Sequence, residues 1–144
     1  MPAHHFLRRQ TNWEELYFYK KADVLYQLTF AFTKRFLKVG DHTIDQMVQA
    51  ARSGKQNIVE GFADGVSSTE MEIKLLNVAR ASIKELKEDY EDYLTTRNIS
   101  KWDEWHPRFA TMLEYCRQHN NQEGYNDMDA KAADEELANL AVTL

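Results

Sequence analysis

One cysteine, no long apolar run and no paired metal-ligand motif are the first features of this 144-residue chain. Because Cys116 stands alone, it cannot form an internal disulfide, and no second cysteine is available for a zinc site. The apolar runs are only a few residues long, far short of the ~20 residues that span a bilayer. The first residues also lack the basic, apolar and small-residue order of a secretion signal. We therefore expect a cytoplasmic protein with no membrane segment.

The sequence also lacks the motifs of the common enzyme sites. Di-metal centres in helical bundles need inward-facing Glu-x-x-His pairs, and no such pair occurs here. There is no glycine-rich phosphate loop, and no identifiable histidine stands ready to activate Cys116 or a serine. We predict a protein without enzymatic activity, cofactor or metal. The histidines all fall at expected helix ends or in loops, and they are His4, His5, His42, His106 and His119.

What the chain does contain is enough apolar material for one core. Apolar residues make up 43% of the chain and aromatic residues 12%, which suits a single domain. The net charge of -5 lies in residues 118–144, where six acidic side chains are accompanied only by Lys131. The rest of the chain is neutral overall, which argues against a strongly basic nucleic-acid binder.

The first long helix is bounded by recognisable signals. Residues 1–10 show no periodicity, and we expect them to form a loose leader. Thr11 and Glu14 match a capping box, so the helix should begin just after them and run to about Lys38. Gly40 then supplies the left-handed residue that ends it.

Residues 50–94 are predicted to contain a helical hairpin. A second capping box, Thr43 with Gln46, opens its first helix, and Gly61 begins the turn. The second helix of the hairpin should span about Thr69–Thr96. Its apolar residues recur at alternating steps of three and four, a seam suited to antiparallel bundle packing.

The C-terminal region is predicted from Pro107 onward. Pro107 fits the first turn of a fourth helix, residues 120–129 have linker composition, and Glu135–Leu144 resumes a helical pattern. We predict an all-α protein, with an antiparallel up-down four-helix bundle over residues 1–119. An acidic linker and the start of an additional helix should follow over residues 120–144, and this helix is either incomplete or docked on another subunit.

The first helix carries more apolar residues than one bundle interior needs. Tyr19, Tyr26 and Phe30 widen its apolar arc beyond the stripe that faces the core. Large apolar surface is uncommon on a soluble monomer, which favours a second face buried between subunits. The alternative is that these aromatic rings form a half-exposed rim.

Basic residues are distributed over the first two helices. Each alone is a solvated side chain, but an oligomer could gather them around an axis and attract phosphates although the chain is acidic. The candidate nucleic-acid-binding residues are Lys20, Lys21, Lys34, Arg35, Lys38, Arg52 and Lys55.

Three segments of the hairpin carry a resemblance to a known family. They are residues 51–53 (ARS), 57–62 (NIVEGF) and 79–86 (ARASIKEL). This pattern resembles the four-helix-bundle proteins related to those encoded by intervening sequences in bacterial large-subunit (23S) ribosomal RNA genes. The acidic C-terminal region looks like the added part of a suffix-bearing subgroup. The sequence departs from the family pattern at Gly54, Lys55 and Ala81.

The resemblance implies a ring-shaped homo-oligomer of up-down bundles, expected to be a pentamer. A related branch, the accessory variability determinant of diversity-generating retroelements, associates with reverse transcriptase and with nucleic acid. Our leading hypothesis is therefore a non-enzymatic oligomer that binds RNA or a reverse-transcriptase-type ribonucleoprotein. The alternative is a protein–protein adaptor that acts through its C-terminal extension. We interpret the polar and glycine residues of the family motif as structural, and they are Asn57, Glu60, Gly61, Arg80 and Glu85.

Overall fold

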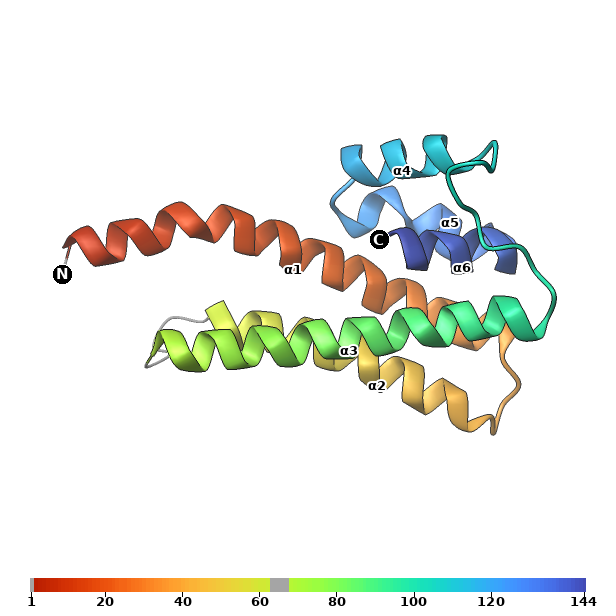
Figure 1. The fold of residues 1–144 in the computed structure, drawn as a ribbon, viewed down its shortest axis with the longest axis horizontal. Coiled ribbons are helices and arrows are strands. Elements are labelled where there is room, and N and C mark those ends of the chain that lie inside the picture. Colours follow the sequence, from red (N-terminus) through yellow and green to blue (C-terminus); the bar gives the residue numbers. More distant parts are fainter. Residues whose placement is uncertain (1, 63–67) are drawn as a thin grey trace.

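A computed structural model describes residues 2–62 and 68–144, with side chains from residue 17 onward except that of Phe62. No strand occurs in these two ranges, which confirms the all-α class. None of the described helices combines the length and apolar character needed to cross a bilayer. The elements are α1 (Pro2–Phe36), α2 (His42–Phe62), α3 (Thr69–Thr96), α4 (Phe109–Gln118), the 3-10 turn η1 (Gln122–Gly124), α5 (Asn126–Lys131) and α6 (Asp134–Thr143) (Figure 1).

The helices α2 and α3 form the predicted hairpin and pack along most of their length (Figure 1). Small residues allow this close approach. A Cβ atom added at Gly54 would lie 2.8 Å from Cγ1 of Ile83, closer than a van der Waals contact, whereas one at Gly61 would meet its neighbours on α3 at an ordinary 3.5 Å. The third helix has the predicted bounds, and its N-terminus is capped by Ser68, whose hydroxyl accepts the backbone N–H of Met71 at 3.1 Å.

The first helix begins earlier than its capping signal predicted. It starts at Pro2 and includes residues 3–10, so the prediction of a loose leader is wrong. Proline is well tolerated in the first turn of a helix, and no other proline or glycine follows before Gly40. The helix ends at Phe36, two residues before the predicted Lys38, and Gly40 adopts a positive φ of 91° in the turn from Lys38 to Asp41 that follows.

The start of α2 is capped two residues earlier than predicted. The carboxylate of Asp41 accepts the backbone N–H of Thr43 at 2.9 Å, so Asp41 rather than Thr43 supplies the capping oxygen. This hydrogen bond lowers the pKa of Asp41 below its usual value. The structure therefore corrects the predicted Thr43–Gln46 capping box: aspartate just before the first turn is the better acceptor.

The last helix, α6, occupies a position in the core that the sequence assigned to α4. It packs on both α1 and α3, whereas α4 lies outside it and contacts α6 (Figure 1). Leu137, Leu140 and Ala141 are fully buried in α6, while α4 buries only Met112 and Cys116. Residues 120–144 are thus part of the hydrophobic core of the chain.

Aromatic and polar side chains meet where α1 and α3 pack. The Phe32 ring lies 5.0 Å from the Tyr90 ring and 4.8 Å from the Tyr93 ring, measured between centroids. The Tyr90 hydroxyl donates to Oγ1 of Thr29 at 2.8 Å, so this buried polar group is satisfied. Burial raises the pKa of Tyr90 well above its ordinary value.

A buried carboxyl group lies where α5 meets α1. Asp129 is 6% exposed, and its Oδ2 accepts from the Gln122 side chain at 2.8 Å. Its Oδ1 is buried, and no hydrogen-bond partner is found for it in the described part of the chain. Burial raises the pKa of Asp129, although the Gln122 hydrogen bond and the charge of Arg35 act in the opposite direction. The carboxylate form is therefore disfavoured in the folded state.

Replacing this carboxylate by an amide should stabilise the protein at neutral pH. A carboxyl group with a raised pKa in the folded state binds its proton more tightly there, so wild-type stability should rise as pH falls through that pKa, until the unfolded chain is also protonated. Asp129→Asn keeps an acceptor for Gln122 and should gain on the order of 1 kcal/mol at pH 7. Urea unfolding from pH 7 to pH 4 checks both effects. A variant that is less stable at pH 7, or that keeps the wild-type rise on acidification, would contradict this assignment.

Candidate helix-binding groove

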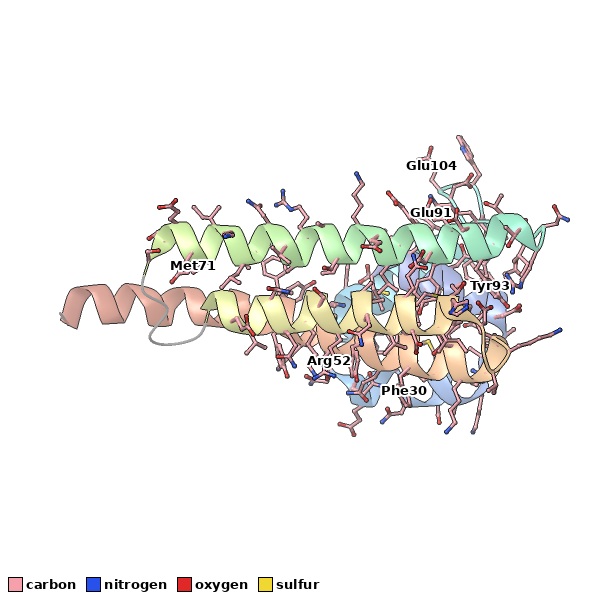
Figure 2. All side chains as sticks on the ribbon, turned by 90° about the horizontal axis from the view of Figure 1, so that it is seen from below. Phe30, Arg52, Met71, Glu91, Tyr93 and Glu104 are labelled. Carbon is pink, nitrogen blue, oxygen red and sulfur yellow. The ribbon has the colours of Figure 1, made fainter. Side chains whose placement is uncertain are left out.

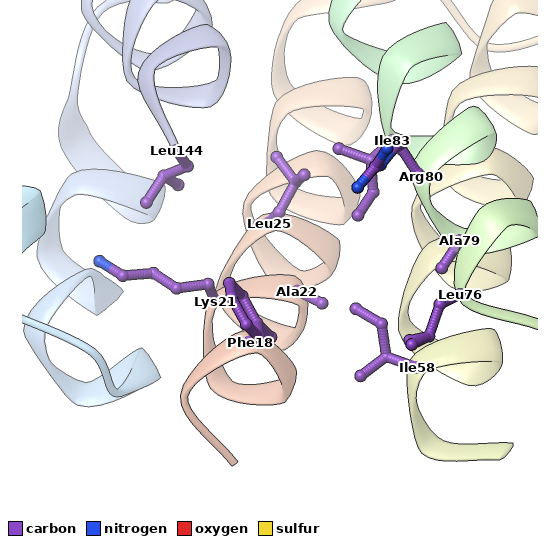
Figure 3. A pocket seen from close by; sticks show the side chains of 10 residues that line it. All are labelled: Phe18, Lys21, Ala22, Leu25, Ile58, Leu76, Ala79, Arg80, Ile83 and Leu144. Atoms are coloured by element: carbon purple, nitrogen blue, oxygen red, sulfur yellow. The ribbon is translucent and has the colours of Figure 1, made fainter. Parts of the chain in front are cut away.

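An apolar groove opens between α1 and α3 at the point where α6 ends. Its cavity volume is about 350 Å³, and α2 contributes to its lining through Ile58. Leu144, the residue after α6, lies at one end of it (Figure 3). The other apolar lining residues are Phe18, Ala22, Leu25, Leu76, Ala79 and Ile83.

The groove exists because the apolar stripes of α1 and α3 continue beyond the length of α6. On α3, Leu86 and Tyr90 are fully buried, but Ile83 and Leu76 on the same seam are only half-buried. On α1, Phe18 is 55% exposed. The same helical faces are therefore covered at one end of the molecule and uncovered at the other.

Two basic side chains also line the groove, and none of its described lining residues is acidic. The Lys21 ammonium donates to the carbonyl oxygens of Cys116 and His119, the latter at 3.1 Å, and so satisfies the C-terminal end of α4. Burial lowers the pKa of Lys21. Arg80 is exposed, and neither an ion pair nor a hydrogen bond links it to another described residue. Arg80 thus remains available to a ligand in the groove.

Three of the seven predicted nucleic-acid-binding residues make contacts within the chain. Lys21 binds the end of α4, as described above. Arg35 donates to the carbonyl oxygens of Asp129 and Ala132, both at 2.7 Å, which caps the end of α5. Lys55 pairs with Asp23 at 2.9 Å, and the hydrogen bond that its ammonium donates to the Asp23 carboxylate raises the pKa of Lys55.

The other four candidates make no such contact with described residues, and they are Lys20, Lys34, Lys38 and Arg52. The first three lie on or just after α1, and Arg52 lies on α2. Figure 2 shows Arg52 and Phe30 along the same edge of the molecule, away from Glu91 and Glu104. Phe30 is 55% exposed, so this edge combines a basic and an aromatic side chain.

The three aromatic residues that widen the apolar face of α1 are only partly buried in the structure. Tyr19 and Tyr26 are half-buried, and the Lys55 ammonium lies 5.7 Å and 5.0 Å from their ring centroids. These distances fit cation–π contacts, which satisfy the rings within one chain. Phe30 is the member of the set that remains exposed.

The polar residues of the family motif have different environments. The Asn57 amide donates to the carbonyl oxygen of Ser53 at 2.8 Å, a local contact within α2 that fits a structural role. Glu60 is exposed, and no described residue forms an ion pair or hydrogen bond with it. Glu85 is also exposed; burial raises the pKa of Asp89, and the negative charge of Glu85 raises it further.

Side chains that could hold a metal ion do not gather anywhere in residues 17–61 and 68–144. No family model matches the chain, and comparison with curated proteins and with solved structures also found no match. A functional interpretation therefore depends on the geometry of this chain. The apolar repeat of α3, which includes Leu76 and Ile83, was predicted to face the bundle, and the groove was not predicted. The sequence feature that could have indicated an uncovered face is the excess of apolar residues on the first helix over those that one bundle interior can bury.

Proposed function

We propose that the protein is a non-enzymatic binding protein that accepts an amphipathic helix in the groove between α1 and α3. The observation that carries this proposal is that the two helices already hold α6 at one end of their shared face. The face continues past Leu144 as an open apolar groove. A bound helix would extend the position of α6 and complete an antiparallel four-helix bundle over more of the length of α3.

The chemistry of the groove supports a helix as the ligand. Its lining is apolar apart from Lys21 and Arg80, and it has no set of converging titratable groups of the kind that catalysis requires. Helix-binding grooves take apolar anchors spaced at i, i+3, i+4 and i+7. The half-buried residues Leu76 and Ile83 are seven apart on α3, and they offer contact points at the same repeat.

Extending α6 tests whether the groove accepts a helix. We would add about four helical turns after Leu144, with leucine at the heptad positions that face α1 and α3. The extended protein should have a higher melting temperature than the original chain, because the extension buries apolar groove surface. The matched control carries the same extension with glutamine in place of each leucine. Equal melting temperatures of the two extended proteins would contradict the proposal.

Assembly and RNA binding form a second candidate function. It is favoured by the exposed ring of Phe30 on the same edge as Arg52, and by the four basic residues without partners in the described part. A homo-oligomer, with the pentamer as the expected form, would bury Phe30 and gather these charges, which would favour RNA or a ribonucleoprotein. Sedimentation of the protein as a monomer, or failure to bind structured RNA at low salt, would reject this candidate.

A further inference from the structure

We infer that the groove selects helices with an acidic flank beside their apolar face. This inference rests on the proposed helix-binding function and names the kind of partner that the site takes. Three features support it: the charges at the rim of the groove, the absence of acidic residues among the described lining, and the character of α6, which lies on the same helices.

The rim on the α3 side is basic. Arg80 lines the groove, and Lys84 follows one helical turn later on α3, where residues four apart are neighbours. Both side chains are exposed, and neither pairs with another described residue. A ligand helix in the groove would therefore lie beside two cations that the chain itself does not neutralise.

The rim on the α1 side adds a third positive charge. Lys21 lines the groove, although two carbonyl oxygens of the chain already accept from its ammonium. These acceptors are neutral dipoles, so the charge of Lys21 still contributes to the local potential. A helix with lysines or arginines along its flank would be repelled from both sides of the groove.

The helix α6 is a precedent for the proposed ligand. Its first turn contains Asp134, Glu135 and Glu136, and its apolar face is buried against α1 and α3. The Tyr93 hydroxyl of α3 donates to the Asp134 carboxylate at 2.8 Å. The covered part of this face thus already holds an amphipathic helix with an acidic end, and α3 supplies a hydrogen bond to that end.

The expected selectivity is modest and salt-dependent. Exposed ion pairs contribute about 0.2–1 kcal/mol each, and salt screens them. Two rim cations should therefore favour an acidic-flanked helix over a basic-flanked one by roughly two- to thirty-fold at low salt. The preference should shrink at high salt, while the apolar part of the affinity persists.

The test uses two fluorescein-labelled synthetic peptides with the same leucine face and the same length. One carries glutamates on the flank beside that face, and the other carries lysines at those positions. Fluorescence anisotropy with the full chain should show tighter binding of the glutamate peptide. In the double variant Arg80→Glu, Lys84→Glu the preference should reverse in favour of the lysine peptide. Both replaced side chains are exposed, so circular dichroism should show an unchanged melting transition.

The outcomes separate this inference from the proposed function. Equal binding of the two peptides, unchanged in the double variant, overturns the acidic-flank inference but leaves helix binding in place. If neither peptide binds and the extended α6 does not raise the melting temperature, the proposed function fails as well. The inference is also overturned if a second copy of the chain occupies the groove, which Ile83→Arg would reveal by abolishing self-association.

Discussion

Leu140→Ala should lower the free energy of unfolding by about 3 kcal/mol, within the range observed for fully buried leucines. Leu140 has no exposed surface and belongs to the main hydrophobic cluster. The same substitution at Leu137, which is equally buried, should have a similar effect. Urea unfolding followed by circular dichroism measures both values, with an unchanged dependence on denaturant if two-state behaviour holds.

The matched control is Leu113→Ala in α4. Leu113 is only half-buried, so its replacement should cost about 1 kcal/mol. This comparison tests which C-terminal helix belongs to the core. If Leu113→Ala were the more damaging change and Leu140→Ala nearly neutral, α4 rather than α6 would stabilise the bundle, as the sequence had suggested.

Phe32→Ala should be the most damaging single change on α1, with a loss of about 3–5 kcal/mol. Phe32 has no exposed surface, and its ring lies within 5.2 Å of three aromatic rings by centroid distance. The substitution therefore removes aromatic contacts of α1 with α3 and leaves a cavity between the helices. Thermal unfolding should show the loss directly, with retained helix content at low temperature if the chain still folds.

Phe30→Ala is the matched control for that experiment, because it makes the same chemical change two residues away on the same helix. Phe30 is 55% exposed, so its loss should alter stability by no more than about 0.5 kcal/mol. It also tests the second candidate function. An oligomer that buries Phe30 should dissociate in this variant while each protomer stays folded. A large loss of stability in a monomeric protein would contradict the exposure of this ring.

Local signals predicted several element boundaries correctly. Gly40 lies in the turn between α1 and α2, where its positive φ costs little without a side chain. The bounds of α3 agree with the prediction, which depended on the regular apolar repeat of this helix. The start of α1 was wrong for the opposite reason. Thr11 and Glu14 match a capping box, but nothing before them breaks a helix, so the helix continues through them to Pro2.

Residue roles at the candidate site were harder to predict. In the sequence, Arg35 and Lys55 cannot be distinguished from Lys34 and Arg52, because all four are basic residues on the first two helices. In the structure, Arg35 and Lys55 bind groups of their own chain. Which lysine meets a helix end or an aspartate depends on the packing of segments distant in sequence. Arg80 was interpreted as part of a structural motif, and its place beside the groove was not predicted.

The sequence by itself determined that this protein is helical, where its third helix lies and that the turn after the first helix contains Gly40. These properties depend on residues close together in the chain, whose periodicity and caps act locally. Only the tertiary structure decided that α6 rather than α4 fills the face between α1 and α3, and that this face continues as an open groove. The reason is that α4 and α6 both present apolar faces. Which of the two helices packs against α1 and α3 depends on how much of its apolar face these long helices can bury, and that is a property of the folded chain.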